Sequence, residues 1–182
     1  MPANTARGFP YPLGTDPLSQ GDDAIHNLAS YLDGNVPKYG DAIDPNVVKV
    51  YRSLATSIPN GGSATITWDQ EVWNPTGMHS TSTNPTRLTA PVAGKYRFDA
   101  QVGYTSNATG YRSLAVTQNA NPVARSTSQA ANGATHVQAV SGEVQMAAGD
   151  YLEVVVGQNS GGALNTTTGV DQTSMSMRRI GP

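Results

Sequence analysis

The chain has 182 residues, enough for one domain of ordinary size and a short appendage. Only 13% of the residues are charged and the formal net charge is -2, which argues against nucleic acid or an anionic membrane as a partner. No apolar run approaches the roughly 20 residues that a membrane span requires. The sequence has no cysteine, so the fold must depend on packing or oligomerisation rather than on disulfides.

Residues 1–17 predict an extended arm without a core of its own. Four prolines, Pro2, Pro10, Pro12 and Pro17, each fix φ and bias the preceding residue toward extended geometry. The first residues contain no apolar h-region, so we do not expect a secretory signal or export by the general pathway.

The next stretch predicts a helix of about three turns, over about residues 21–32. Its apolar residues recur at helical spacing and are Ile25, Leu28, Ala29 and Leu32. Asp22 lies near the positive end of the helix dipole, and Gly34 can end the helix. A helix of this length is too short to be stable alone, so its apolar stripe must pack on another surface.

Residues 34–46 predict a linker, which divides the chain into an attachment segment, 1–33, and a main domain, 47–182. The linker is rich in Asp, Gly and Pro, which leave little scope for regular structure. Charge follows the same division. Residues 1–46 hold six acidic and two basic residues, a net of -4, whereas 47–182 hold seven acidic and nine basic residues, a net of +2.

The main domain shows its β character most clearly between Lys95 and Tyr104. Apolar side chains alternate strictly with polar ones there, and a period of two predicts a strand with one buried and one solvent-facing side. An Ala-Gly turn at Gly94 precedes this strand, and a second one at Gly149 precedes Tyr151. The recurrence predicts one all-β domain with a repeated corner.

Short strands joined by Asn, Gly and Pro turns fill the rest of the domain, which predicts a β-sandwich or barrel. No second helical pattern is present. The predicted strands are 47–58, 64–73, 87–89, 95–104, 112–118, 122–126, 136–146, 151–156 and 174–180.

The span from Trp68 to Val102 resembles the jelly roll of the C1q/TNF-like proteins. It has an aromatic-rich strand, an Asn/Gly loop, a short strand ending near Ala90-Pro91, and a following strand opened by Gly94, Tyr96 and Phe98. Downstream, MAAGDYLEVVV and MSMRRIGP resemble that family's last strands, with Met175 and Met177 where aromatic or Leu residues are usual. The resemblance implies an all-β, C1q/TNF-like jelly-roll sandwich and a homotrimer.

The N-terminal block PYPLGTDPLSQGDDAIHNLASYLD resembles the opening segment of virion structural proteins from tailed phages of actinobacteria. This second resemblance implies a capsid decoration or head-fibre protein on the virion surface, assembled in the host cytoplasm and bound to the major capsid protein or another virion protein. The residues expected to make that attachment are Phe9, Tyr11, Leu13, Leu18, Ile25, Leu28 and Leu32.

Candidate residues for the subunit contact come from the strand at 151–156. Tyr151 and Val155 face the side opposite to Leu152, Val154 and Val156, and a strand that is apolar on both sides must be covered on both sides. We therefore expect Tyr151 and Val155 in the trimer interface. Tyr96 and Phe98, on the strand 95–104, are further candidates.

No catalytic, cofactor-binding or metal-binding residue is predicted. The histidines His26, His79 and His136 are isolated, and we expect them to be solvated on the surface. Asp69 and Glu71, at i and i+2, could imitate a glycosidase pair but are expected to be solvated. Neither a calcium loop, a nucleophile elbow nor a phosphate loop is present.

The main alternative is a tail-tip or tail-fibre adhesin that binds host surface glycan. Trp68, Trp73 and Tyr111 could form a sugar-binding platform if exposed, although strand aromatics are more often core. Exposed aromatics at the loops 74–84 or 105–111, both expected at the distal end, would favour it. An enzyme that cleaves cell-wall polysaccharide through Asp69 and Glu71 is a third hypothesis. A cellular C1q-like ligand is a fourth, against which the lack of an export signal argues.

Overall fold

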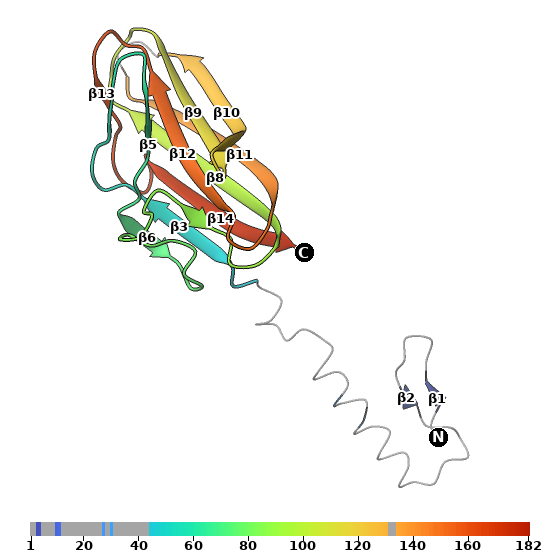
Figure 1. The fold of residues 1–182 in the computed structure, drawn as a ribbon. Helices are drawn as coiled ribbons and strands as arrows, with labels where there is room; N and C mark the ends of the chain where they lie inside the picture. Colours follow the sequence, from blue (N-terminus) through green and yellow to red (C-terminus); the bar gives the residue numbers. More distant parts are fainter. Residues whose placement is uncertain (1–2, 5–9, 12–26, 28–29, 31–43, 131–133) are drawn as a thin grey trace. The chain divides into compact units, whose positions relative to one another are not determined.

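The computed structural model describes residues 3–4, 10–11, 27, 30, 44–130 and 134–182. The chain divides into two compact units, Met1–Ile43 and Asp44–Pro182. Two short paired strands belong to the first unit, and the other described strands form an antiparallel β-sandwich in the second (Figure 1).

In the first unit, β1 (Ala3–Asn4) pairs antiparallel with β2 (Pro10–Tyr11). The predicted helix over 21–32 falls almost entirely outside the described residues. Asn27 and Ser30, which belong to that stretch and are described, have helical backbone and are exposed.

One sheet of the sandwich is organised around β12. Its order is β10-β9-β12-β5, and β7 pairs with the first two residues of β12, before the part of β12 that pairs with β5. The bounds are β5 Ser63–Thr65, β7 Leu88–Thr89, β9 Tyr111–Gln118, β10 Asn121–Gln129 and β12 Tyr151–Gln158.

The other sheet is organised around β8 and β14, in the order β11-β8-β14-β3-β6. Its strands are β3 Val47–Tyr51, β6 Gln70–Trp73, β8 Gly94–Tyr104, β11 His136–Met146 and β14 Ser174–Gly181. A small pair, β4 (Ser57–Ile58) with β13 (Leu164–Asn165), lies beside the two sheets.

Strict side-chain alternation produces the core between the sheets. Along β8, Tyr96, Phe98, Ala100 and Val102 are buried, while Arg97 between them is exposed. β12 sends Leu152, Val154 and Val156 into the same core from the opposite sheet. The all-β sandwich predicted from the period of two is therefore confirmed.

Two predicted strands are each divided in the structure. The stretch 47–58 forms β3 and β4, and 64–73 forms β5 in one sheet and β6 in the other. Ile66 and Trp68 stay buried between β5 and β6, where the chain crosses from sheet to sheet, so burial continues although the strand does not. The two-residue β13 was not predicted.

The two ends of the sandwich differ. We call the end where β3 begins and β14 ends the proximal end, and the turns 90–94 and 147–150 lie there too. The loops 105–110 and 159–170 form the opposite end, which we call the distal end (Figure 1). The loop 74–84 follows Trp73, which pairs with Lys49 near the beginning of β3. The expectation that 74–84 is a distal loop is therefore wrong, because the register of β6 returns the chain to the proximal end.

The second Ala-Gly corner is held by Asp150. Its carboxylate accepts hydrogen bonds from Asn119 Nδ2 at 2.7 Å, Ala147 N at 2.8 Å and Gln118 Nε2 at 3.2 Å. The hydrogen bonds from Asn119, then from the Ala147 backbone, lower the pKa of Asp150. Gly149 supplies the left-handed backbone, with φ of 89°, that this turn needs.

Candidate functional site

Tyr151 and Val155 both lie on the solvent-facing side of the β12 sheet, which we call the β12 face. Val155 is half-buried and lies in register between Thr65 on β5 and Ala115 on β9. Tyr151 is half-buried near the proximal end of the same strand. Thr65 and Ala115 are small and uncharged, whereas Arg125 on β10, in register with Ala115, is an exposed cation farther out on this face.

The charged residues beside Tyr151 contact each other and the tyrosine ring. The guanidinium of Arg87 lies 3.9 Å from the centre of the Tyr151 ring, and Arg87 Nε lies 3.4 Å from Glu153 Oε1. Thr86 also donates a hydrogen bond of 2.6 Å to that oxygen. This cluster orders the Tyr151 ring without leaving a free charge beside it.

Tyr96 and Phe98 are fully buried inside a single sandwich, so their assignment to a subunit interface is wrong. The Tyr96 hydroxyl donates to the Val92 carbonyl at 2.8 Å, and burial raises its pKa. The Phe98 ring packs so closely on Gly142 that a Cβ there would lie 2.6 Å from Phe98 Cζ. Their strand alternates correctly, but its apolar side faces the core.

The solvent-facing side of the other sheet, which we call the open face, contains two hollows. One, of about 370 Å³, lies over β8, β11 and β14 and is lined by residues that include Gln101, Ala139, Ser141, Val170 and Ser174. The other, of about 390 Å³, lies over β3, β6, β8 and β14 and is lined by Val47, Val48, Trp73, Arg97, Asp99, Ser176, Met177 and Arg178. Sequence reasoning missed both, because they depend on which strands become neighbours.

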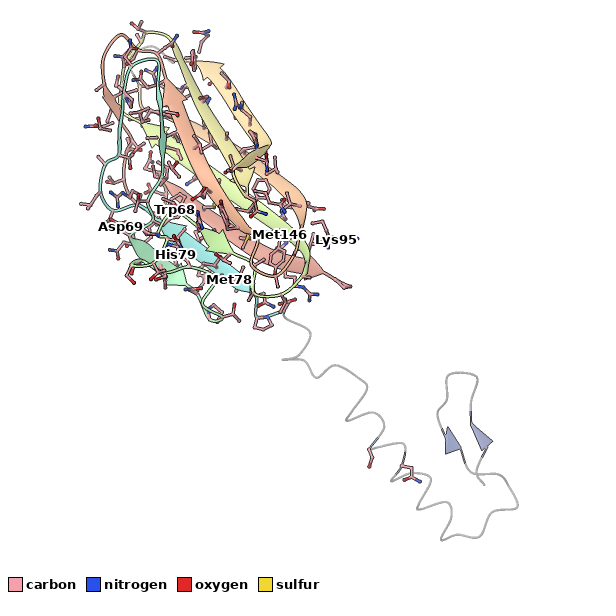
Figure 2. All side chains as sticks on the ribbon, viewed as in Figure 1. Trp68, Asp69, Met78, His79, Lys95 and Met146 are labelled. Carbon is pink, nitrogen blue, oxygen red and sulfur yellow. The ribbon has the colours of Figure 1, made fainter. Side chains whose placement is uncertain are left out.

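The three aromatic residues named as a possible sugar platform are separated in the structure. Trp68 is buried in the core near Met78 and His79 (Figure 2). Tyr111 is half-buried at the distal end, and Trp73 alone is well exposed, at 48%. The core prediction therefore holds for Trp68 and fails for Trp73, which lies on the edge strand β6.

A buried arginine organises the distal end. Arg112 is fully buried and donates hydrogen bonds to the carbonyls of Asn107, Thr109 and Tyr111 at 3.0, 3.0 and 2.9 Å. Burial lowers its pKa, because a buried guanidinium loses hydration. Arg112 alternates in phase with the core residues Leu114 and Val116, and this was the one sequence signal that could have identified it.

An ion pair and hydrogen bonds hold the start of the second unit at the proximal end. Asp44 Oδ2 lies 2.9 Å from Arg179 Nη1, and Asp44 Oδ1 accepts from the Asn46 backbone at 2.9 Å. Burial raises the pKa of Asp44, but hydrogen bonds from Asn46 and Arg179 outweigh that effect and lower it. Arg179 also donates to the Ala93 carbonyl at 3.1 Å.

His79 is buried, so the expectation of a solvated surface histidine is wrong for this residue. Its Nδ1 lies 2.8 Å from Glu71 Oε1, and its Nε2 lies 3.2 Å from the Pro85 carbonyl. Asp69 is separately engaged, by Ser53 at 2.7 Å and Arg52 at 3.2 Å. Asp69 and Glu71 are therefore each engaged by protein groups of their own and share no partner.

A serine–histidine contact joins the edges of the two sheets. Ser128 Oγ on β10 lies 2.8 Å from His136 Nε2 on β11, and it accepts from Gln138 Nε2 at 2.9 Å. Gln138 also donates to the Arg112 carbonyl at 2.8 Å. Among the described residues no carboxylate hydrogen-bonds to His136, so this contact lacks the third group that orients the base in a catalytic triad. The arrangement acts as a polar seam between the sheets.

The predicted attachment residues lie outside the described side chains. Six of them are not among the described residues, namely Phe9, Leu13, Leu18, Ile25, Leu28 and Leu32. Tyr11 is described only as part of β2. Within the described ranges, no three His, Asp or Glu side chains gather as a metal site would require. In the described part of the chain, no helix combines the length and the apolar character that a membrane span requires.

The sandwich is similar to solved structures from two related groups. Murine APRIL matches with a TM-score of 0.60 and 14% identity, over 74% of this chain and 98% of that one. The TNF protein Eiger from S. frugiperda matches with 0.57 and 13%, over 74% and 92%. The globular domain of zebrafish complement 1qA matches with 0.53 and 14%, over 74% and 97%.

These matches show that the fold is the C1q/TNF-like jelly roll expected from the sequence. No family model matches the chain, and no curated protein matches it either. At 13–14% identity the solved structures establish the fold alone. The role of the protein has to be argued from its own residues.

Proposed function

We propose that this protein is a non-enzymatic structural protein of a tailed-phage particle. It is a homotrimer that attaches through its N-terminal unit and displays its jelly roll outward. The observation that carries the proposal is the division into two compact units, Met1–Ile43 and Asp44–Pro182. The described residues of the second unit bury a core between their own two sheets, and the proposal assigns attachment to the first unit.

The β12 face is the proposed surface for self-association. Interfaces of stable homo-oligomers are depleted of charge at their centre. Val155 and Ala115 occupy the centre of the β12 face, with Arg125 beside them on β10, whereas three charged residues, Lys49, Arg97 and Asp99, occupy that of the open face. A threefold contact through the β12 face would cover Val155 and Tyr151.

A charge placed on this face tests the proposed contact. Val155→Arg should dissociate the trimer, because each subunit would bring an unpaired charge into the interface. Val137→Arg is the matched control, since Val137 is an exposed valine on β11, a strand of the other sheet. A Val155→Arg protein that keeps the wild-type sedimentation coefficient would rule out the β12 face as the contact.

Attachment is assigned to the apolar residues of the N-terminal unit, Phe9, Tyr11, Leu13, Leu18, Ile25, Leu28 and Leu32. The proposed partner is the major capsid protein or another virion protein. The resemblance of residues 10–33 to the opening segment of phage virion proteins supports this assignment. The protein would assemble in the host cytoplasm and end on the virion surface.

Capsid decoration is preferred to a role as a tail adhesin. The loops that an adhesin would use, 74–84 and 105–111, expose no Trp or Phe, and 74–84 belongs to the proximal end. The distal loops 105–110 and 159–170 contain no charged residue. A neutral tip rich in Ser, Thr, Asn and Gly suits a displayed surface without strong affinity for a partner.

Incorporation into particles tests the attachment assignment. Removal of residues 1–33 should leave a soluble trimer that no longer joins particles, as measured by quantitative immunoblot of purified virions. Removal of residues 1–8 is the control, because it leaves all seven attachment residues in place. Normal incorporation without residues 1–33 would refute the proposal.

A further inference from the structure

We propose that the hollow beside Trp73 binds an acidic saccharide, meaning a sugar ring that bears a carboxylate. The Trp73 hollow is the open-face hollow lined by Val47, Trp73, Arg97, Asp99, Ser176 and Arg178. This inference goes beyond the proposed function, and it does not depend on where the particle binds the protein.

The size and apolar wall of the hollow suit a sugar ring. Its volume of about 390 Å³ lies within the range of about 300–1,000 Å³ that is typical of small-molecule sites. Val47 and Trp73 supply its outward-facing apolar side chains, and nearly half of the surface of Trp73 is exposed. An exposed indole can pack on the C–H face of a pyranose while leaving the hydroxyl groups free for polar contacts.

Positive charge around the indole selects for an anionic ligand. Arg97 and Arg178 line the hollow, and the ammonium of Lys49 lies 5.5 Å from the centre of the Trp73 ring. Asp99 is the one acidic residue among those that line it. Glu143 on β11 is the cross-strand neighbour of Arg97 but does not line the hollow. Arginine binds carboxylates through two parallel hydrogen bonds, which gives Arg178 the role of recognising the sugar carboxylate.

Polar groups for the sugar hydroxyls are also present. Arg97 Nε and Asp99 Oδ2 are 3.6 Å apart and both side chains are about half exposed, so this ion pair is weak and can exchange for ligand contacts. Ser176 on β14 is half-buried and lies in register between Asp99 on β8 and Lys49 on β3, and within the described residues its hydroxyl makes no hydrogen bond. A carboxylate, an arginine and a hydroxyl on one side of an exposed indole form an amphipathic site that matches a sugar.

A second copy of the chain suits this hollow less well. The hollow is surrounded by four charged residues, Lys49, Arg97, Asp99 and Arg178. The core of a protein interface is depleted of such charges. The proposed subunit contact through Tyr151 and Val155 lies on the other sheet, so the Trp73 hollow stays open in the trimer.

Isothermal titration calorimetry of the full-length protein with trigalacturonate tests the proposal. Its trimethyl ester is the matched neutral ligand. Trigalacturonate should bind, its affinity should fall with added salt because the contact is ionic, and the ester should bind at least about tenfold more weakly. Trp73→Ala and Arg178→Gln should each weaken binding at least about tenfold, whereas Arg125→Gln, which removes an exposed charge on β10, should not.

Three outcomes would overturn the proposal: no binding of trigalacturonate, equal affinity for the ester, or a Trp73→Ala protein with a changed subunit number. The last would mean that the hollow is a subunit contact. Arg178→Gln keeps the test valid if Trp73→Ala fails to fold. Subunit number and incorporation into particles are measured separately, so a failure to bind sugar is distinguishable from a failure of the proposed function.

Discussion

Replacement of Arg112 by methionine tests how the distal end is held. The guanidinium satisfies three carbonyls, two of them in the loop 105–110, and no carboxylate among its recorded contacts. Hydrogen bonds from a charged donor contribute about 1.5–3 kcal/mol each. In the variant, water can replace some of these hydrogen bonds at the exposed loop. The variant also no longer carries the desolvation cost of a buried charge, so the net loss is smaller than the sum of the hydrogen bonds. We expect Arg112→Met to lose about 2–3 kcal/mol of unfolding free energy.

Urea unfolding, followed by tryptophan fluorescence at one fixed protein concentration, measures this loss. In thermal unfolding the same loss corresponds to a decrease in Tm of about 6–12 °C for a domain of this size. Arg125→Met, an exposed arginine on the neighbouring strand, should change stability by less than about 0.5 kcal/mol. An Arg112→Met protein as stable as this control would refute the argument that buried Arg112 holds the distal loops.

Three further predictions concern the core and the proximal turn. Gly142→Ala should cost about 1–3 kcal/mol in urea unfolding, because its Cβ would lie 2.6 Å from Phe98 Cζ; a neutral result would show that the ring has room to move. Tyr104→Phe removes a hydrogen bond of 2.6 Å to the Ser113 carbonyl and should cost about 1–2 kcal/mol in the same assay, whereas unchanged stability would contradict that bond. Because the folded-state pKa of Asp150 is lowered below its usual 3.8, its contribution is present above that pH and is lost as the pH falls. Stability measured from pH 6 to pH 2 should therefore fall less steeply in Asp150→Asn than in the wild type, and equal slopes would contradict this assignment.

The layout of the sandwich could be predicted because strand alternation and turn chemistry are local. The alternation from Lys95 to Tyr104 identified one strand and the face that enters the core. The turn at Gly149 likewise marked the start of β12. Such signals need no knowledge of which strands become neighbours.

Features that depend on the order of the strands could not be predicted. Trp73 is exposed because β6 is an edge strand, and His79 is buried because a loop folds back onto Glu71. The period of two shows that Tyr96 and Phe98 lie on one side of their strand. It does not show whether that side faces the core or another subunit, and in the structure it faces the core. Arg112 occupies a core position, but nothing local shows that three carbonyls converge on it.

The central claim is that three sandwiches associate and leave the N-terminal unit for attachment. Sedimentation equilibrium of the full-length protein at micromolar concentration tests it most directly. One chain has a mass of 19.0 kDa, so the account predicts a species of three times that mass. A single species of 19.0 kDa under those conditions would contradict it.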